Sequence, residues 1–354
     1  MRAPLYLNAS AFVKIMALIL LSMFLTSCGN VKTENPVTKT NFLLDTLIQI
    51  TAYGDNASSA IDQAYDRIND IQKKMTASGD DSEVIEINKK AGLGFQKVSP
   101  DTFYVIKRGL YYSQSSHGRF DITVGPLVKL WGIGTDKARV PSEAEIKSAL
   151  LHIDYKNVVL NENENSVMLK EPGMAIDLGA IAKGYAADEV VRILKENGIK
   201  SAAADLGGNI YVLGKKPNGS PWKIGIQDPF EPRGNTFATV DVADKTLVTS
   251  GVYERYFIKD GKRYHHILDT STGYPVENGL VSVTIISDRS IDADGLSTAV
   301  FALGLKDGLR YVEKLPGVDA VMVTEDRKVY TSSGVEKYNF RIVNSQFKLE
   351  KLSE

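Results

Sequence analysis

The chain has 354 residues, of which 43% are hydrophobic and 24% are charged, a balance typical of one large or two modest globular domains. Its formal net charge of −1 shows no basic excess, so we expect no nucleic-acid partner. The single cysteine excludes an internal disulfide bond.

The N-terminal segment is typical of a targeting signal. Basic residues precede an apolar run over 15–25, which is too short to span a bilayer comfortably. Small residues then lead to Cys28, in an arrangement that resembles the lipobox of bacterial lipoproteins. We therefore expect residues 1–27 to be a lipoprotein signal peptide, Cys28 to be lipidated, and residues 28–41 to form a polar tether. An uncleaved anchor and a plain secretory signal are the alternatives.

The next part of the chain predicts a strand and two helices. Phe42 to Tyr53 is apolar and β-branched, as in a strand, and the apolar stripe from Ile61 to Met75 has helical spacing. The polar segment 76–88 is either a solvated loop or a ligand-facing loop. Ser99 as N-cap, followed by proline, predicts another helix that ends near Ser115.

A glycine-rich stretch and two short elements follow. Four glycines, a proline and Trp131 interrupt the apolar stretch from His117 to Gly134, which we expect to pack around something. A capping box from Ser142 to Glu145 predicts a short helix. The apolar triplets at 158–160 and 167–169 predict a β-hairpin.

The stretch Asp177–Asp188, DLGAIAKGYAAD, organises the rest of the chain. A strand-like run over 173–176 leads into it, and a helical pattern leaves it and stops at Gly198. Asp177 and Lys183 therefore lie where a strand becomes a helix, and the free N–H groups of a helix start suit phosphate. An ordinary turn with a capping aspartate would give the same pattern.

The C-terminal half consists mainly of short strands. The run 202–213 is interrupted by Gly207–Asn209, which predicts a bulge or a close backbone approach. A hairpin is expected over 257–268, and a second short helix over 307–314. Further strands are expected at 222–227, 236–242, 246–249, 280–286, 320–324, 328–330 and 340–343. Strands and helices mix without strict βαβ alternation, which predicts an α+β fold.

Asp294 and Thr298 form a candidate metal site. They lie four residues apart in an expected helix with Asp292 as N-cap, so both project from one face. Carboxylate and hydroxyl oxygens are ligands for a hard cation such as Mg²⁺. The alternative is an aspartate favoured by the helix dipole and a threonine bonded back to its own helix.

His265 and His266 are candidate catalytic residues. Neighbouring residues of a strand point to opposite faces, so at most one of the two rings faces a given site. One buried and one exposed structural histidine is the alternative interpretation.

Together these motifs resemble the ApbE family of FAD:protein FMN transferases, bacterial flavin transferases that are often lipoproteins. Five blocks carry the resemblance, in the family's order: Gly118–Leu127, Asp177–Asp188, Asp205–Asn209, Thr249–Arg255 with Tyr264–Asp269 and Thr272–Pro275, and Ala293–Ala299. The resemblance covers about Phe42 to Val343. Thr270 departs from it, because the family commonly has proline there, and we expect this to change loop stiffness and not chemistry.

The resemblance implies a single ApbE-like α+β domain over 42–345, with mixed, largely antiparallel sheets, packed helices and a C-terminal tail over 346–354. It implies that FAD binds with Mg²⁺ on its pyrophosphate. A Thr or Ser hydroxyl of an acceptor flavoprotein then attacks the FMN-side phosphorus, and AMP leaves. This chemistry needs positioning and neutralised phosphate charge. A metal-dependent FAD pyrophosphatase and a non-catalytic flavin-binding lipoprotein are the alternatives.

The resemblance also assigns residues. Asp294, Thr298 and the backbone carbonyl of Ala180 would hold the metal, and His265 or His266 would orient or deprotonate the attacking hydroxyl. The residues expected to contact FAD are Asp177, Lys183, Leu268, Ser82, Glu83, Gly118, Arg119, Phe120 and Asp121. The lipid on Cys28 would hold the protein on the extracytoplasmic side of a bacterial cell membrane.

Overall fold

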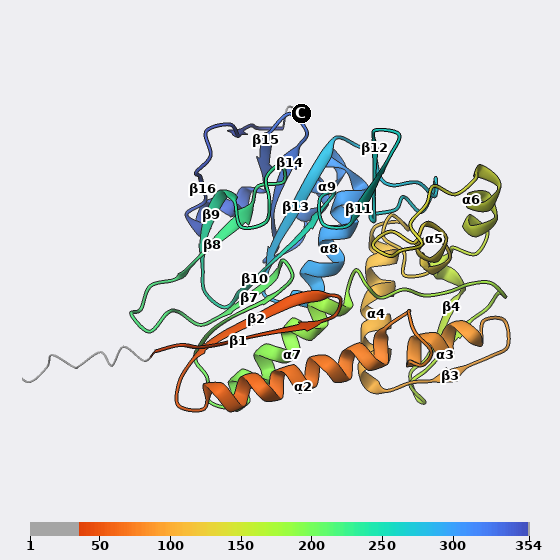
Figure 1. The fold of residues 1–354 in the computed structure, drawn as a ribbon, viewed down its shortest axis with the longest axis horizontal. Coiled ribbons are helices and arrows are strands. Elements are labelled where there is room, and N and C mark those ends of the chain that lie inside the picture. Colours follow the sequence, from red (N-terminus) through yellow and green to blue (C-terminus); the bar gives the residue numbers. More distant parts are fainter. Residues whose placement is uncertain (1–34, 353–354) are drawn as a thin grey trace, which may run out of the picture. The chain divides into compact units, whose positions relative to one another are not determined.

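The computed structural model describes residues 35–352, so the expected signal peptide and Cys28 lie outside the described residues. Within them, helices and largely antiparallel sheets form an α+β fold, which confirms the expected fold class (Figure 1). In this same region no helix has the length and apolar character needed to cross a membrane.

A large sheet forms the centre of the described fold. Its strands follow the order β1-β2-β6-β7-β10-β13-β14-β15-β17 (Figure 1). Their bounds are β1 Val37–Leu43, β2 Thr46–Tyr53, β6 Ser201–Leu206, β7 Asn209–Leu213, β10 Lys245–Gly251, β13 Leu280–Ser287, β14 Asp319–Thr324, β15 Lys328–Thr331 and β17 Lys348–Leu349. Neighbouring strands are antiparallel, except that β15 and β17 are parallel. Every residue of β13 is buried, because both faces of the sheet are covered there.

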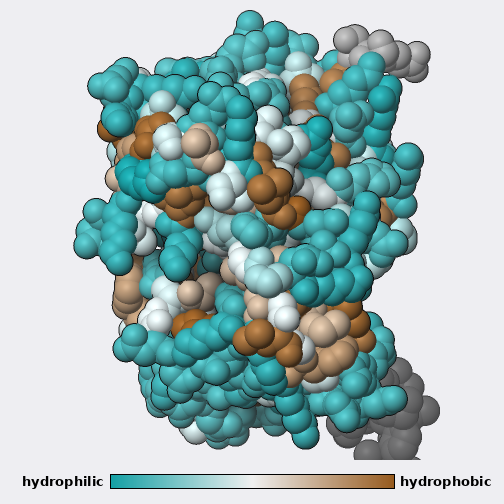
Figure 2. All heavy atoms as spheres, turned by 90° about the vertical axis from the view of Figure 1, so that its right-hand side faces the viewer, coloured by the Kyte–Doolittle hydropathy of each residue, from teal (hydrophilic) through white to brown (hydrophobic). Residues whose placement is uncertain are grey.

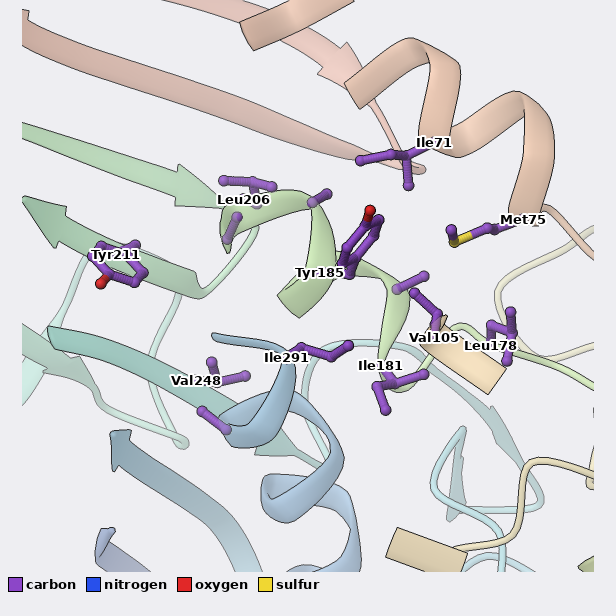
Figure 3. Close-up of a cluster of buried hydrophobic side chains, with 14 of the residues drawn as sticks. Ile71, Met75, Val105, Leu178, Ile181, Tyr185, Leu206, Tyr211, Val248 and Ile291 are labelled. Carbon is purple, nitrogen blue, oxygen red and sulfur yellow. The ribbon is translucent and has the colours of Figure 1, made fainter. Parts of the chain in front are cut away.

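Long helices cover one face of the large sheet. Their bounds are α2 Ala57–Met75, α7 Ala182–Glu196, α8 Ser290–Leu303 and α9 Leu305–Val312. The helix α7 packs against both α2 and α8. Figure 3 shows this arrangement, with Tyr185 of α7 between Ile71 on α2 and Ile291 on α8. These apolar contacts fix the start of α7, which carries the Asp177–Asp188 motif, relative to α8.

Arg67 on α2 adds a polar clamp to this packing. Its guanidinium donates two hydrogen bonds of 2.8 Å to the Asp101 carboxylate and one of 2.8 Å to Glu189 on α7. The Tyr185 hydroxyl donates to the same aspartate over 2.6 Å. The Arg67 hydrogen bonds hold the pKa of Asp101 well below its usual range. The clamp therefore ties α7 to its neighbours through charge as well as apolar burial.

A small sheet covers the other face. It has the order β16-β9-β8, with bounds β16 Arg341–Ile342, β9 Thr236–Val242 and β8 Trp222–Gln227. A separate apolar cluster, which includes Phe237 and Val240 from β9 and Val321 from β14, fills the space between the two sheets. The short 3₁₀ helix η2, Ser333–Tyr338, borders it.

The remaining elements lie toward the right of Figure 1. Their bounds are α3 Glu83–Lys89, α4 Pro100–Ser115, α5 Gly125–Trp131, α6 Glu143–Leu150, η1 Tyr155–Asn157, β3 Gln96–Lys97, β4 Val158–Asn161, β5 Ser166–Leu169, β11 Tyr256–Lys259 and β12 Lys262–His265. Strands β3, β5 and β4 form a small sheet, and β11 with β12 forms a hairpin. Figure 2 shows this side as mainly hydrophilic, with separate small apolar areas, as is normal for a protein surface.

The structure corrects several expected elements in the N-terminal half. The region around 42–53 forms two antiparallel strands joined at Leu44 and Asp45, whose φ angles are 52° and 56°. The first strand begins at Val37, ahead of the expected domain start, and Lys348–Leu349 pairs with β15 inside the expected C-terminal tail. The polar segment 76–88 contains the start of α3, which the sequence pattern did not predict.

Other corrections concern the motif segments. Residues 173–176 form no strand, and Ala175 makes only an isolated bridge to Val124. Gly207 and Gly208 form the turn between β6 and β7, and not a bulge within one strand. Asp292 is not the N-cap of α8, which begins at Ser290, and its carboxylate instead pairs with Arg108 at 2.6 Å.

Candidate functional site

The start of α7 lies directly against α8 at Gly184. The Gly184 N–H donates to Asp294 Oδ2 over 2.7 Å. A Cβ atom on Gly184 would lie 2.3 Å from the backbone oxygen of Ser290 and 2.7 Å from Asp294 Cβ. Only glycine therefore permits this contact, which brings the DLGAIAKG segment and Asp294 to one point.

The same contact frees the carbonyl of Ala180. In a continuous helix the N–H of residue 184 would donate to the carbonyl four residues earlier. Here it donates to Asp294 instead, and within residues 35–352 no other group donates a hydrogen bond to the Ala180 carbonyl. This carbonyl lone pair is available to a cation.

Asp294 is a buried carboxylate, with 5% of its surface exposed. Burial raises its pKa, whereas the charge of the half-buried Lys183 and the hydrogen bond from Gly184 lower it. An ionised carboxylate in such a place is favoured by a nearby cation. Lys183 thus lies within electrostatic reach of Asp294.

Thr298 stands one turn after Asp294 on α8, next to strand β10. Its hydroxyl oxygen lies 3.2 Å from Ser250 Oγ, which in turn lies 2.8 Å from Ser297 Oγ. The structure therefore places three hydroxyl groups together, within one helical turn of Asp294 on α8 and on the adjoining strand β10.

This donor set fits Mg²⁺. A carboxylate, a hydroxyl and a backbone carbonyl are all hard oxygen donors. In the part of the chain that the structure describes, no three His, Cys, Asp or Glu side chains are grouped in a way that would hold a metal ion. A single carboxylate agrees with the usual binding of Mg²⁺ by one or two carboxylates together with substrate phosphates. The assignment of Asp294, Thr298 and Ala180 stays a prediction.

Asp177 fixes the turn that precedes α7. Its backbone N–H donates to the Ile122 carbonyl over 2.8 Å, and its Oδ1 accepts the Gly179 N–H over 2.7 Å. Burial raises the pKa of its carboxyl, while the Gly179 N–H and the charge of Arg255 lower it. The charge of Arg255 therefore acts on the Asp177 carboxyl.

His265 is held inside the fold by both of its ring nitrogens. It is buried, and its Nδ1 accepts the Ile267 N–H over 3.3 Å. Its Nε2 lies 3.0 Å from the Val276 carbonyl, which only accepts, so the proton must be on Nε2. Both ring nitrogens are thus engaged within the fold, and burial lowers the pKa of the ring.

His266, directly after β12, faces the site. Its Nδ1 lies 3.2 Å from the Arg255 carbonyl, so Nδ1 carries the proton and Nε2 keeps a free lone pair. Burial lowers the pKa of the ring to about 3, and the charges of Arg255 and Lys183 act in the same direction. The ring is therefore neutral at physiological pH and lies near Lys183.

Sequence reasoning missed the roles of Arg255 and Asp188. The Arg255 side chain is exposed, and its charge acts on both Asp177 and His266. The Asp188 carboxylate caps α8 by accepting the N–H groups of Ser290 over 2.7 Å and Ile291 over 3.0 Å. Both residues belong to motif blocks, but their partners lie far away in sequence, so no local signal identified them.

The expected flavin contacts Ser82 and Glu83 have structural partners. Ser82 Oγ accepts the Ile85 N–H over 2.9 Å and donates to the Thr76 carbonyl over 2.6 Å. The Glu83 carboxylate accepts both the N–H and the hydroxyl of Ser99, at 3.0 and 2.8 Å. These bonds fix the starts of α3 and α4, and within residues 35–352 no hydrogen bond or ion pair joins either residue to Asp294 or His266.

The Gly118–Asp121 turn is bound to the loop after His266. The Gly118 carbonyl accepts the Thr270 hydroxyl over 2.6 Å, and exposed Arg119 lies 3.3 Å from Asp269. Phe120 and Asp121 are buried, and Asp121 accepts bonds from Thr123 and the Tyr155 N–H. A proline at 270 would have no hydroxyl for this bond, so the departure from the family pattern has a structural use.

The Leu268 side chain packs in the apolar cluster of Leu127, Trp131 and Ile146. Its side chain is therefore committed to the core, and the backbone is the part that could line a ligand.

Of the predicted site residues, the structure groups Asp177, Lys183, His266, Asp294 and Thr298 around the start of α7.

Comparisons with known proteins identify the family and relatives of this chain. The model of the ApbE family matches residues 44–322. The chain is 34% identical to an FAD:protein FMN transferase of Treponema pallidum, over 92% of this chain and 94% of that protein. It is 38% identical to an FAD:protein FMN transferase of Klebsiella pneumoniae, over 81% of this chain and 88% of the relative.

Solved structures show the same fold. The crystal structure of an ApbE protein from Thermotoga maritima superposes with a TM-score of 0.79 at 35% identity, covering 86% of this chain and 99% of that one. The flavin transferase ApbE of Vibrio cholerae gives a TM-score of 0.78 at 27% identity, with the same coverage.

Proposed function

The chain belongs to the ApbE family, and we propose that it transfers the FMN part of FAD to a Thr or Ser hydroxyl of an acceptor protein, with the help of Mg²⁺. The curated relatives carry the name of FAD:protein FMN transferase. The proposal for this chain rests on one observation. Lys183 lies within electrostatic reach of both the Asp294 carboxylate and the neutral ring of His266, at the start of α7.

Phosphate charge is neutralised on one side of this site. Asp294, Thr298 and the Ala180 carbonyl would hold Mg²⁺, which supplies positive charge to pyrophosphate oxygens when bound. Lys183 adds an ammonium beside it, and the start of α7 adds the positive end of a helix dipole. Positioning and charge neutralisation are the main requirements of phosphoryl transfer.

His266 accepts the proton of the attacking hydroxyl. The acceptor oxygen forms a bond to the FMN-side phosphorus, its proton moves to His266 Nε2, and the bond from phosphorus to the AMP oxygen breaks. AMP leaves with that electron pair, and FMN stays on the acceptor as a phosphoester. Arg255 holds the ring through its carbonyl.

The low pKa of His266 describes the ring without substrate. Two positive charges, Arg255 and Lys183, oppose protonation in that state. The negative pyrophosphate of FAD reduces their effect and raises the pKa toward the range suited to a general base. Substrate binding therefore makes His266 a better base.

The proposed reaction is tested by incubating the chain with FAD, Mg²⁺ and a Thr-containing acceptor and detecting flavin fluorescence in a denaturing gel. A labelled acceptor supports transfer. Free FMN and AMP, formed at one rate with or without acceptor, would support the pyrophosphatase alternative, in which water attacks. Recovery of bound but intact FAD would support a flavin-binding protein without catalysis.

We also propose that the protein is lipid-anchored at Cys28 and acts on the extracytoplasmic side of a bacterial cell membrane. The support is the sequence around Cys28, which resembles a lipobox and contains the sole cysteine of the chain. The acceptor must then present its hydroxyl on that same side.

A further inference from the structure

We propose that Ser250 is a positioning residue for Thr298. It accepts a hydrogen bond from the Thr298 hydroxyl, and this leaves the lone pairs of the Thr298 oxygen free to bind the cation. This inference rests on the Mg²⁺ site of the proposed function, and it assigns a role to a residue outside the predicted ligand set. It follows from a chain of hydroxyl contacts between β10 and α8.

A series of hydrogen bonds connects the Thr298 hydroxyl to the backbone of Asp294. Thr298 Oγ1 lies 3.2 Å from Ser250 Oγ, and Ser250 Oγ lies 2.8 Å from Ser297 Oγ. Ser297 Oγ lies 2.9 Å from the backbone carbonyl oxygen of Asp294. Ser297 is fully buried, so water does not provide alternative partners for its hydroxyl.

The backbone carbonyl of Asp294, at the end of this series of hydroxyl groups, determines which hydroxyl donates each hydrogen bond. A carbonyl oxygen only accepts, so Ser297 must donate its single proton to Asp294 O. Ser297 Oγ then accepts from Ser250, which uses the one proton of Ser250. Ser250 Oγ can therefore only accept from Thr298.

This direction prepares Thr298 for a metal ion. A hydroxyl binds a cation through an oxygen lone pair, so its proton must point away from the cation. With the proton directed to Ser250, the Thr298 oxygen presents lone pairs on its other side. Without Ser250, the proton is free to turn toward the Asp294 carboxylate and occupy the space of the cation.

The neighbouring Thr249 provides a matched control. It lies on the same strand, is half-buried like Ser250, and pairs with Thr284 of β13 over 2.8 Å. Successive strand residues point to opposite faces, so this pair lies away from Thr298. Thr249→Ala removes one hydroxyl bond from β10 without changing the chain that reaches Thr298.

The test measures Mn²⁺ affinity of the full chain by the electron paramagnetic resonance signal of free Mn²⁺, without turnover. We expect Ser250→Ala to raise the Kd about 10-fold, the lower end of the range for residues that orient metal ligands. Ser250→Thr, which keeps the hydroxyl, and Thr249→Ala should bind like the wild type. Thermal unfolding confirms that each variant folds.

A double-mutant cycle separates positioning from general damage. If Ser250 acts through the Thr298 hydroxyl, Ser250→Ala adds little further loss of affinity to Thr298→Val. Wild-type affinity in Ser250→Ala, or losses that add in the double variant, would overturn the inference while leaving the metal site standing. Absence of Mn²⁺ binding to the wild type would instead contradict the proposed metal site itself, and the inference with it.

Discussion

His266 Nδ1 lies 3.2 Å from the backbone carbonyl oxygen of Arg255, whereas both ring nitrogens of the adjacent His265 are bonded inside the fold. Two neighbouring histidines thus have different hydrogen-bond partners, and only His266 keeps a ring nitrogen free of a partner among residues 35–352. The Arg255 carbonyl fixes the tautomer of His266 and directs its free lone pair away from the backbone.

The two histidines predict opposite phenotypes. His266→Ala should lower kcat by about 10²- to 10⁴-fold, the usual contribution of a general base, with FAD affinity nearly unchanged. His265→Ala should instead lower the free energy of unfolding by about 1–3 kcal/mol, because a buried hydrogen-bonded ring is lost. Steady-state kinetics and urea unfolding of both variants provide the comparison. Equal effects on kcat from both substitutions would contradict the assignment.

The pH dependence of stability gives a second prediction about His266. Its pKa is about 3 in the folded protein and about 6.5 in an unfolded chain, so the unfolded state binds more protons between these values. The neutral ring therefore contributes stability that is complete above about pH 6.5 and is lost progressively as the pH falls toward 3. His266→Gln should lose less stability than the wild type between pH 7 and pH 5. Parallel pH profiles of the two proteins would show that the fold does not lower the pKa of this half-buried ring.

The proposed metal ligands predict a loss of transfer activity that is larger for Asp294 than for Thr298. Asp294→Asn removes the one charged side chain of the proposed ligand set, and we expect at least about a 100-fold loss of activity at limiting Mg²⁺. Thr298→Val removes a neutral donor and should have a smaller effect, partly restored by high Mg²⁺. Mg²⁺ titrations of transfer activity measure both effects, with thermal unfolding as the control for folding. Normal transfer by both variants at limiting Mg²⁺ would place the metal elsewhere.

The lipid anchor predicts a change of location. Cys28→Ala removes the thiol that would carry the lipid, so the protein should leave the membrane fraction or keep its signal peptide. Fractionation with immunoblotting of the variant and of wild type measures both outcomes. Processing and membrane retention like those of the wild type would contradict lipidation at Cys28.

Local signals in the sequence predicted the elements that depend on local chemistry. The serine cap and proline predicted α4, which begins at Pro100 and ends at Ser115. The capping box of α6 forms as expected between Ser142 and Glu145. The β1–β2 turn was missed, because Leu44 and Asp45 are not the glycines that usually mark a left-handed backbone.

Such local signals do not predict contacts between residues that lie far apart in the sequence. Asp188 caps a helix that begins about a hundred residues later, a contact that only the packing of α7 against α8 creates. The sequence predicted that the two histidine rings face opposite sides. Only the fold shows that the His266 ring is the one on the side of Lys183, because the fold brings the start of α7 to the end of β12. Ser250 gave no signal, because its role depends on α8.

The most direct test of the proposed function is the quantity of covalent FMN on a Thr-containing acceptor, measured against free FMN at equal FAD and Mg²⁺. Water is abundant, so efficient transfer requires the acceptor to place its hydroxyl in line with the phosphorus better than water does. We predict that labelled acceptor accumulates with one AMP released for each FMN attached, and that free FMN forms only slowly. Free FMN released at the same rate with and without acceptor, and no labelled acceptor, would contradict the proposal.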